Sequence, residues 1–380
     1  MDQADAWREA GLFDPLDPAA DDRLELLRYL TERGATTEQM VEAHGMGALP
    51  AVAGELVTLG RSGTVSVADI AQRCGLSISR VMRILLAAGI PAERDTQVPA
   101  DLERLMSAFE QGAALMGEEA ILAFTRVLGA AANNVAEAAI ALFFAELGPG
   151  TERGGPDELG RARLAEAATT VFTEVPEVLA RLVLDVFERA QRRAQTARSW
   201  LGPGPSADEG AGPPTEVVAL GFVDLVGSTA WAQTLPPRDH SLALSRFESA
   251  AWTSAVLAGG RVVKMIGDEV FFAAPTAEAA SRIALEVCGA VAEDDVLLSA
   301  RGAVGIGPVT PREGDYFGPL VNLLSRLVKV GGPGEVAVTE AVAEELPPDG
   351  WVVRPLEPAA LRGIDAPVRA FIADHRGLAD

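Results

Sequence analysis

Lysine is almost absent from this chain. Only two of its 32 basic residues are lysines, and arginine takes nearly every other position where a positive charge would serve. The two side chains differ where one compact ammonium must reach one acceptor. A lysine that survives this bias suggests a specific role, and one of the two, Lys264, stands four residues before Asp268 in RVVKMIGDEVFF.

Cysteine, long apolar runs and positive net charge are also lacking. Cys74 and Cys288 lie far apart in the sequence and indicate neither a disulfide framework nor a cysteine metal site. No stretch reaches the ~18 apolar residues that a membrane span needs. The acidic N-terminus does not have the pattern of a signal peptide, so we expect a cytoplasmic protein with no transmembrane segment. The formal charge of −22 repels phosphate backbones and argues against nucleic acid as the main partner.

A segment rich in Gly and Pro divides the chain. Residues 202–214 contain four Gly and four Pro, a composition that neither extends a helix nor pairs as a central strand. We therefore predict one domain at 1–200, a linker at 201–214 and a second domain at 215–380.

The first region has helical patterns. Thr36 and Gln39 have the spacing of a capping box, and several stretches repeat apolar residues at intervals near 3.6. These patterns predict an all-α domain, with helices that include 104–116, 118–130, 132–147 and 176–199.

The second region alternates short strands with amphipathic helices. This texture predicts an α+β fold with a mixed sheet that helices cover on one face. The expected strands are 216–224, 261–266, 269–274, 297–306, 335–339 and 368–373, and the expected helices are 228–235, 239–258, 276–292, 318–330 and 340–346.

Two segments of this region each present a carboxylate at the end of a strand. The apolar run EVVALGFVD ends at Asp224, as a strand buried on both faces does, and Gly227-Ser228-Thr229 then opens a helix whose amides favour phosphate. Gly267-Asp268 lies at a hairpin turn. If the two strands are neighbours, Asp224 and Asp268 suit divalent cations shared with a substrate's phosphates. Helix capping by Asp224 and ordinary turn chemistry at Asp268 are the alternatives.

A third segment, GDYFGPLVNLLSRL, begins at Gly314. Asn322 and Arg326 are four residues apart and so share one face of the predicted helix, with Asp315 just upstream. Such a polar pair either faces solvent or contacts a substrate, and the apolar helix around it favours contact with a substrate.

Together the three segments resemble class III nucleotidyl cyclases, in particular bacterial adenylyl cyclases, over residues 215–373. The resemblance implies a catalytic domain with a ferredoxin-like core. It also implies a role for each motif residue: metal binding by Asp224 and Asp268, adenine recognition by Lys264 and Asp315, ribose orientation by Asn322, transition-state stabilisation by Arg326 and, in LRGI, contact with the terminal phosphates by Arg362.

The resemblance implies conversion of ATP to 3′,5′-cyclic AMP and pyrophosphate with two divalent cations, Mg²⁺ or Mn²⁺, in each site. The choice of adenine has a chemical basis, because Lys264 donates to the N1 acceptor and Asp315 accepts from the N6 amine, whereas guanine reverses both demands. In this family the metal aspartates and the other four residues of one site come from opposite chains. We therefore expect a head-to-tail homodimer.

Residues 64–90 resemble a helix-turn-helix, with Arg80 and Arg83 on the second helix. This pattern suggests DNA binding. Residues 1–214, however, hold 19 basic and 32 acidic residues, and this excess of negative charge favours a packing module of the same shape.

The arrangement as a whole resembles actinobacterial cyclases whose N-terminal domain inhibits catalysis and responds to pH. His44 is the only histidine before the linker, so a histidine proton switch depends on one residue. Carboxylates with raised pKa values, or an apolar ligand near the helices around Ala138–Phe144, are alternative signals. A non-catalytic binding protein with a cyclase-like fold is the alternative to an enzyme regulated by its own N-terminal domain.

Overall fold

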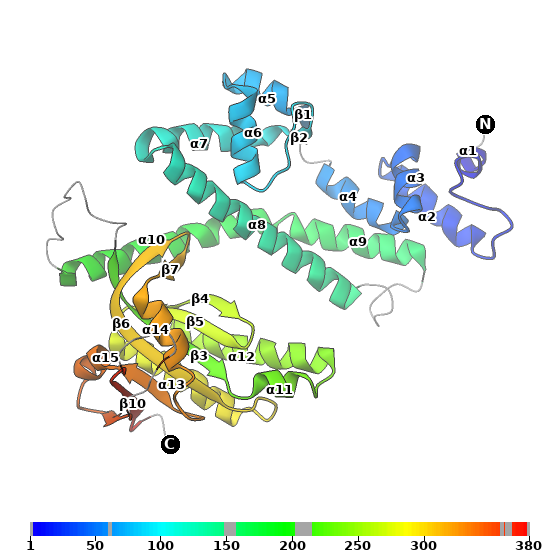
Figure 1. Cartoon of the computed structure of the whole chain (residues 1–380). Coiled ribbons are helices and arrows are strands. Elements are labelled where there is room, and N and C mark those ends of the chain that lie inside the picture. Colours follow the sequence, from blue (N-terminus) through cyan, green and yellow to red (C-terminus); the bar gives the residue numbers. More distant parts are fainter. Residues whose placement is uncertain are drawn as a thin grey trace. The chain divides into compact units, whose positions relative to one another are not determined.

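The structure is a computed structural model that describes residues 3–59, 63–147, 157–201, 215–357, 361 and 367–377 (Figure 1). Its contacts divide the chain into two compact units, Met1–Glu188 and Arg189–Asp380. The division falls within helix α10 (Val175–Leu201). The linker at 201–214 stays a prediction, because residues 202–214 lie outside the described part.

The first unit is largely helical and has two apolar cores. One core lies among α1–α4 and α9, and the other among α5–α8. The elements before α10 are α1 (Gln3–Glu9), α2 (Ala20–Glu32), α3 (Thr37–Gly45), α4 (Val52–Leu59), β1 (Thr64–Ser66), α5 (Val67–Cys74), α6 (Ile78–Ala87), β2 (Gln97–Pro99), α7 (Glu103–Met116), α8 (Glu118–Leu147) and α9 (Glu158–Phe172), with 3₁₀ turns at Leu49–Ala51 and Ala100–Leu102.

The capping-box prediction is confirmed, and one helix prediction is wrong. The Thr36 hydroxyl accepts a hydrogen bond from the Gln39 amide, and the Gln39 side chain accepts one from the Thr36 amide. The two helices expected at 118–130 and 132–147 are the single helix α8. Gly129 lies inside it, where a Cβ would overlap the backbone of Ala88. Here glycine allows a close approach of two segments and does not end a helix.

The first unit is not purely helical, because β1 and β2 form a two-stranded antiparallel ribbon with Val65 opposite Val98. Strands of three residues are too short to show an alternating pattern in a sequence. Between them, α5 and α6 are joined at Gly75, whose φ of 67° is left-handed. The predicted helix-turn-helix shape is therefore confirmed.

The second unit is an α+β domain with a mixed sheet, as predicted. The strand order is β4-β5-β3-β6-β8-β10-β9; β6 and β8 are parallel, every other neighbouring pair is antiparallel, and β7 pairs with β6. Its elements are β3 (Glu216–Leu225), α11 (Ser228–Ala232), α12 (Pro237–Leu257), β4 (Arg261–Ile266), β5 (Glu269–Ala274), α13 (Ala277–Glu293), β6 (Ala300–Arg312), β7 (Asp315–Phe317), α14 (Pro319–Leu327), β8 (Val336–Thr339), α15 (Glu340–Glu345), β9 (Trp351–Pro355) and β10 (Ala370–His375).

Helices pack on both faces of this sheet, so the expectation of one covered face is wrong (Figure 1). Ala219 and Val223 of β3 join the core beneath α12 and α13. Leu220 and Phe222 point the other way and join Leu324 of α14. The alternation along a strand places Asp224 on the same face as Leu220 and Phe222. The end of β3 therefore presents its carboxylate on the side of α14.

The strand predictions fail at two short elements. β7 and β9 were not expected, since three and five residues carry little periodic signal. β7 exists because β6 runs on to Arg312 and offers a partner opposite Asp315. Among the described residues, no helix combines the length and the apolar character needed to cross a membrane.

Candidate active site

Three charged residues form a row across the middle of the sheet. In the strand register, Asp224 of β3 lies opposite Glu269 of β5 on one side and opposite Arg301 of β6 on the other. Residues directly opposite each other in antiparallel strands point to the same face. The row therefore brings two carboxylates and a guanidinium together where β3 ends.

Asp224 is buried and forms ion pairs with two basic side chains, Arg301 and Lys329. Its side chain is 5% exposed. Its Oδ2 accepts hydrogen bonds from Arg301 Nε and Nη2, at 3.2 and 3.0 Å, and its Oδ1 accepts one from Lys329 Nζ at 2.6 Å. The helix-capping alternative is wrong, since the cap position of α11 is Gly227 and no side-chain cap is present there.

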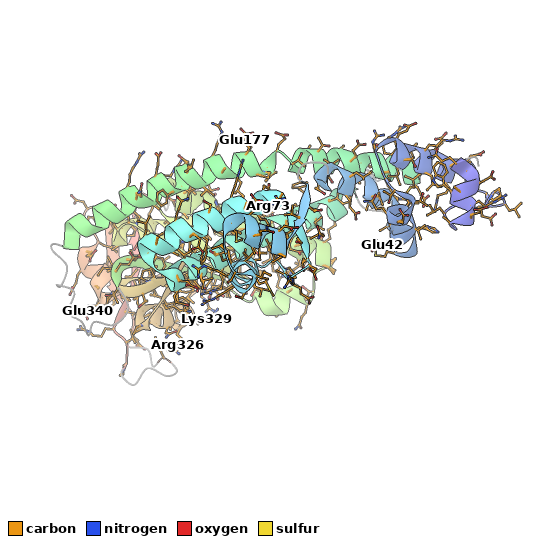
Figure 2. All side chains as sticks on the ribbon, turned by 90° about the horizontal axis from the view of Figure 1, so that it is seen from above. Glu42, Arg73, Glu177, Arg326, Lys329 and Glu340 are labelled. Atoms are coloured by element: carbon orange, nitrogen blue, oxygen red, sulfur yellow. The ribbon has the colours of Figure 1, made fainter. Side chains whose placement is uncertain are left out.

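Lys329 joins the two carboxylates of the row. It follows α14, three residues after Arg326, and both residues are labelled in Figure 2. Its Nζ also lies 3.1 Å from Glu269 Oε2. Burial raises the pKa of the Glu269 carboxyl, although the bond from Lys329 lowers it in part. Burial lowers the pKa of the Lys329 ammonium, but the bonds to Asp224 and Glu269 outweigh burial and leave that pKa raised.

Asp268 lies at the tip of the β4–β5 hairpin, beside Asp224. The Leu225 amide donates a hydrogen bond to the Asp268 carbonyl at 3.1 Å, and β3 pairs with β5, so the condition that the two strands are neighbours is met. Gly267 has a φ of 63°, which a two-residue hairpin turn requires of its glycine. The Asp268 carboxylate accepts a hydrogen bond from the Ser228 hydroxyl. Ser228 opens α11, a helix of only five residues.

Lys264 and Asp315 form an ion pair, although 51 residues separate them. A register shift between Val262 and Lys264 marks a bulge in β4, and bulges redirect side chains. Asp315 comes from β7, and its second carboxylate oxygen accepts a hydrogen bond from the Tyr316 amide at 2.8 Å. Lys264 and Asp315, the pair predicted to recognise the base, therefore come together from β4 and β7, two strands that do not pair with each other.

Asn322 and Arg326 both lie on α14, one turn apart. Asn322 is exposed and Arg326 is partly exposed, while Leu324 and Leu327 face the sheet. The side chains of Asn322 and Arg326 are thus available to a molecule outside this unit. Arg362 lies outside the described residues, so its contact with the phosphates stays a prediction.

Sequence reasoning missed Glu269, Arg301 and Lys329. The signal for Lys329 was present, because it is the second of the two lysines in the chain. Glu269 directly follows Asp268, but only the strand register shows that it lies opposite Asp224. Nothing in its local sequence distinguishes Arg301.

The carboxylates fit hard cations only as part of a larger ligand set. Oxygen ligands such as those of Asp224 and Asp268 are what Mg²⁺ and Mn²⁺ prefer. Within the described part of the chain, however, no three His, Cys, Asp or Glu residues gather closely enough to hold an ion. A cation here would complete its coordination with oxygens of water or of a substrate.

The arginines of the helix-turn-helix are engaged inside the first unit. Arg80 binds Glu110 and Glu118, with Nε 2.6 Å from Glu110 and Nη1 3.1 Å from Glu118. Arg83 binds Glu118 and Glu119, each at 2.7 Å. These carboxylates come from α7 and α8, so the second helix of the motif uses its cations for packing. This supports the packing interpretation over DNA binding.

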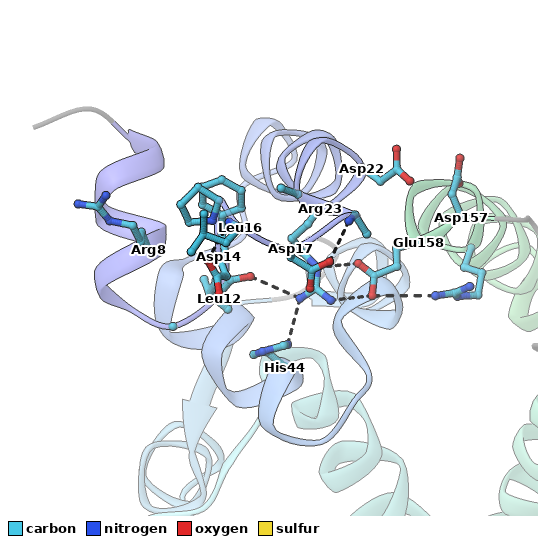
Figure 3. Close-up of a pocket in the computed structure, with 16 residues that line it drawn as sticks. Arg8, Leu12, Asp14, Leu16, Asp17, Asp22, Arg23, His44, Asp157 and Glu158 are labelled. Carbon is cyan, nitrogen blue, oxygen red and sulfur yellow. Dashed lines mark hydrogen bonds and ion pairs between the residues drawn. The ribbon is translucent and has the colours of Figure 1, made fainter.

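A cavity of about 780 Å³ lies in the first unit, among α1, α2, α3 and α9 (Figure 3). Its lining is largely charged. Arg23 Nε lies 2.6 Å from Glu158, and its Nη1 lies 3.1 Å from His44 Nδ1. A guanidinium can only donate, so His44 Nδ1 is the acceptor in this arrangement.

The chain has curated relatives along nearly its whole length. An uncharacterised protein of Mycobacterium tuberculosis is 31% identical over 370 residues, which cover 97% of this chain and 93% of that protein. An adenylate cyclase of Glutamicibacter nicotianae is 27% identical over 78% of this chain and 75% of its own length. A pH-sensitive adenylate cyclase of Mycobacterium tuberculosis is 25% identical over 93% of this chain and 88% of its own length. No protein-family model matches the chain.

The second unit, with its mixed sheet and the helices that cover it, has the fold class of nucleotidyl cyclase catalytic domains. The relatives narrow this class further. The chain belongs to the family of class III adenylate cyclases found in actinobacteria.

Proposed function

We propose that this protein converts ATP to 3′,5′-cyclic AMP and pyrophosphate. The observation that carries the proposal is the placement of the motif residues. Asp224 and Asp268 lie side by side at adjacent strand ends, and Lys264 and Asp315 are in contact. The relatives named adenylate cyclase support the same reaction.

Four residues are proposed to handle the nucleoside. Lys264 would donate to adenine N1 and Asp315 would accept from the N6 amine. Asn322 would orient the ribose so that its 3′-hydroxyl lies in line with the α-phosphorus. Arg326 would stabilise the negative charge that develops in the transition state.

Asp224 and Asp268 are the residues that would hold two divalent cations. When bound, these ions would acidify the 3′-hydroxyl and neutralise the triphosphate. The Ser228 hydroxyl donates a hydrogen bond to the Asp268 carboxylate and so restrains its orientation. Arg362 is proposed to contact the terminal phosphates.

We infer that the working enzyme is a head-to-tail homodimer. α14 presents Asn322 and Arg326 on a partly exposed face, where they can reach a site on a second copy. One symmetric dimer would then contain two equivalent sites, each with metal aspartates from one chain and nucleoside-binding residues from the other.

Incubation of the protein with ATP and Mn²⁺ is expected to yield cyclic AMP and pyrophosphate in equal amounts. GTP should be used much more poorly, and Lys264→Ala should lose discrimination between the two bases, because it removes the donor to N1. Product analysis by chromatography measures both. A non-catalytic binding protein would retain ATP and form no product, and that result would exclude the proposed reaction.

The first unit is proposed to regulate the second through α10, which runs from one unit into the other. Val178, Leu182 and Val186 on this helix are each more than half exposed, so they form an apolar stripe available to another surface. The cavity at Arg23 and His44 is lined by charged groups. An apolar ligand there would remove water from these groups at a cost in free energy, so the cavity favours a proton or a polar ligand as the regulatory signal.

Removal of residues 1–200 is expected to raise the catalytic rate at neutral and alkaline pH. An inhibitory domain would hold the two chains in an orientation that separates the halves of each site. Rates of cyclic AMP formation against pH, for full-length and truncated proteins at equal dimer concentration, measure the effect. Equal rates and equal pH profiles would mean that the first unit does not regulate catalysis.

A further inference from the structure

We propose that Lys329 is a tethered cation that competes with a divalent metal for the carboxylates of the site. The inference rests on the proposed function, since it assumes that Asp224 binds metal. Lys329 Nζ lies 2.6 Å from Asp224 Oδ1 and 3.1 Å from Glu269 Oε2. Its ammonium therefore engages the Asp224 Oδ1 oxygen, which a metal ion bound by Asp224 would use.

The charges of this cluster are balanced without a metal. Asp224 and Glu269 carry two negative charges, and Arg301 and Lys329 carry two positive charges. A divalent cation gains little from a neutral cluster. If the Lys329 ammonium leaves, the remaining cluster is negative, and the nearby Asp268 carboxylate adds to the field. Metal binding at Asp224 is therefore coupled to the departure of Lys329.

Lys329 is the cation that can leave. Its side chain is 50% exposed, whereas that of Arg301 is 21% exposed. Arg301 also donates a hydrogen bond through Nη1 to the Lys329 carbonyl at 3.1 Å, so it fixes the backbone while the lysine stem stays free. A flexible four-carbon stem can move its ammonium into water, but the guanidinium on the central strand β6 is held from both sides.

A lysine suits this role better than an arginine. The ammonium is a compact point charge that can be exchanged for a metal ion, while a guanidinium binds a carboxylate through a planar fork. In a chain where arginine replaces lysine almost everywhere, Lys329 is one of two exceptions. The other exception, Lys264, belongs to the proposed base-reading pair.

The affinity for Mn²⁺ alone, measured from the electron paramagnetic resonance signal of the free ion, tests the competition. Lys329→Met is expected to bind Mn²⁺ with about tenfold lower Kd than the unchanged protein, a difference of about 1.4 kcal/mol. Lys329→Arg, which keeps the charge, should not gain affinity. Asp268→Ala should bind the ion more weakly than the unchanged protein.

A second measurement uses the unchanged sequence and does not depend on the folding of a variant. Reductive ¹³C-methylation keeps the positive charge of lysine and labels two side chains, Lys264 and Lys329, besides the terminal amine. Titration with Mg²⁺ is expected to move the Lys329 methyl signal toward that of free dimethyl-lysine and to leave the Lys264 signal in place. Lys329→Arg assigns the signals.

The outcomes separate this inference from the proposed function. Equal Mn²⁺ affinities in the unchanged protein and Lys329→Met, or a Lys329 signal that Mg²⁺ does not move, would overturn the competition and leave the metal site intact. Weaker binding in Lys329→Met would also overturn it, because the lysine would then support the site. If no protein in the series binds Mn²⁺, the assignment of Asp224 and Asp268 to metal fails, and the inference fails with it.

Discussion

Replacing Asp268 by Ala is expected to abolish cyclic AMP formation at any concentration of Mg²⁺ or Mn²⁺. The carboxylate is proposed to bind both ions, and excess metal cannot replace a missing ligand that both share. Asp268 is the simpler of the two metal positions to test, because among the described residues its side chain is hydrogen-bonded to the Ser228 hydroxyl and not to a charged partner. Rates of product formation over a wide metal range measure the effect, with thermal unfolding as a check that the variant is folded.

The same loss is expected for Asp224→Ala, but this variant needs a stability measurement beside it. Its carboxylate is buried and bonded to Arg301 and Lys329, and its removal leaves these two partly exposed cations without a carboxylate partner, which lowers stability. Asp224→Asn keeps the volume but loses the charge and replaces one acceptor oxygen by an NH₂ donor, which faces Arg301 or Lys329. Glu278→Ala, which removes a surface ion pair with Arg282 on α13, is the matched control and should keep its activity. Retention of more than about a tenth of the rate in Asp268→Ala, a loss of only ~1.4 kcal/mol, contradicts the metal assignment.

Mixing Asp268→Ala with Arg326→Ala is expected to restore activity that neither protein has alone. If the two residues of one site come from opposite chains, a mixed dimer has one site with both lesions and one site with neither. Random exchange of equal amounts makes half of the dimers mixed, so about a quarter of the original activity should return. Cyclic AMP formation against mixing ratio gives the measurement.

The control for this experiment pairs two lesions from the same half of the site. Asp268→Ala mixed with Asp224→Ala leaves each site without one metal ligand, so no activity should return. Formation of mixed dimers is shown independently by two affinity tags on the two proteins. If mixed dimers form and Asp268→Ala with Arg326→Ala stays inactive, each site lies within one chain and the shared-site proposal is wrong.

Much of the second unit could be predicted because its signals are local. The apolar run before Asp224, the Gly267-Asp268 turn and the spacing of Asn322 and Arg326 each lie within a few residues of sequence. Chain geometry converts such spacing directly into a buried strand, a hairpin tip and one face of a helix. These elements appear in the structure where they were expected.

The errors arose where a segment depends on a distant partner. β7 forms only because β6 extends far enough to pair with it. α8 continues through Gly129 because the backbone of Ala88 packs against that glycine. The second face of the sheet is covered because Leu324 of α14 packs in one apolar cluster with Leu220 and Phe222 of β3. None of these partners can be read from the local sequence.

The sequence by itself predicted the residues proposed for the chemistry and determined the family to which the chain belongs, because the motif side chains are few and their spacing is specific. The tertiary structure alone decided what surrounds them. The strand register set Glu269 and Arg301 on either side of Asp224, and the packing of α14 brought Lys329 to the same carboxylate. Register and packing depend on contacts between residues up to 105 positions apart, and no local pattern fixes contacts at that range.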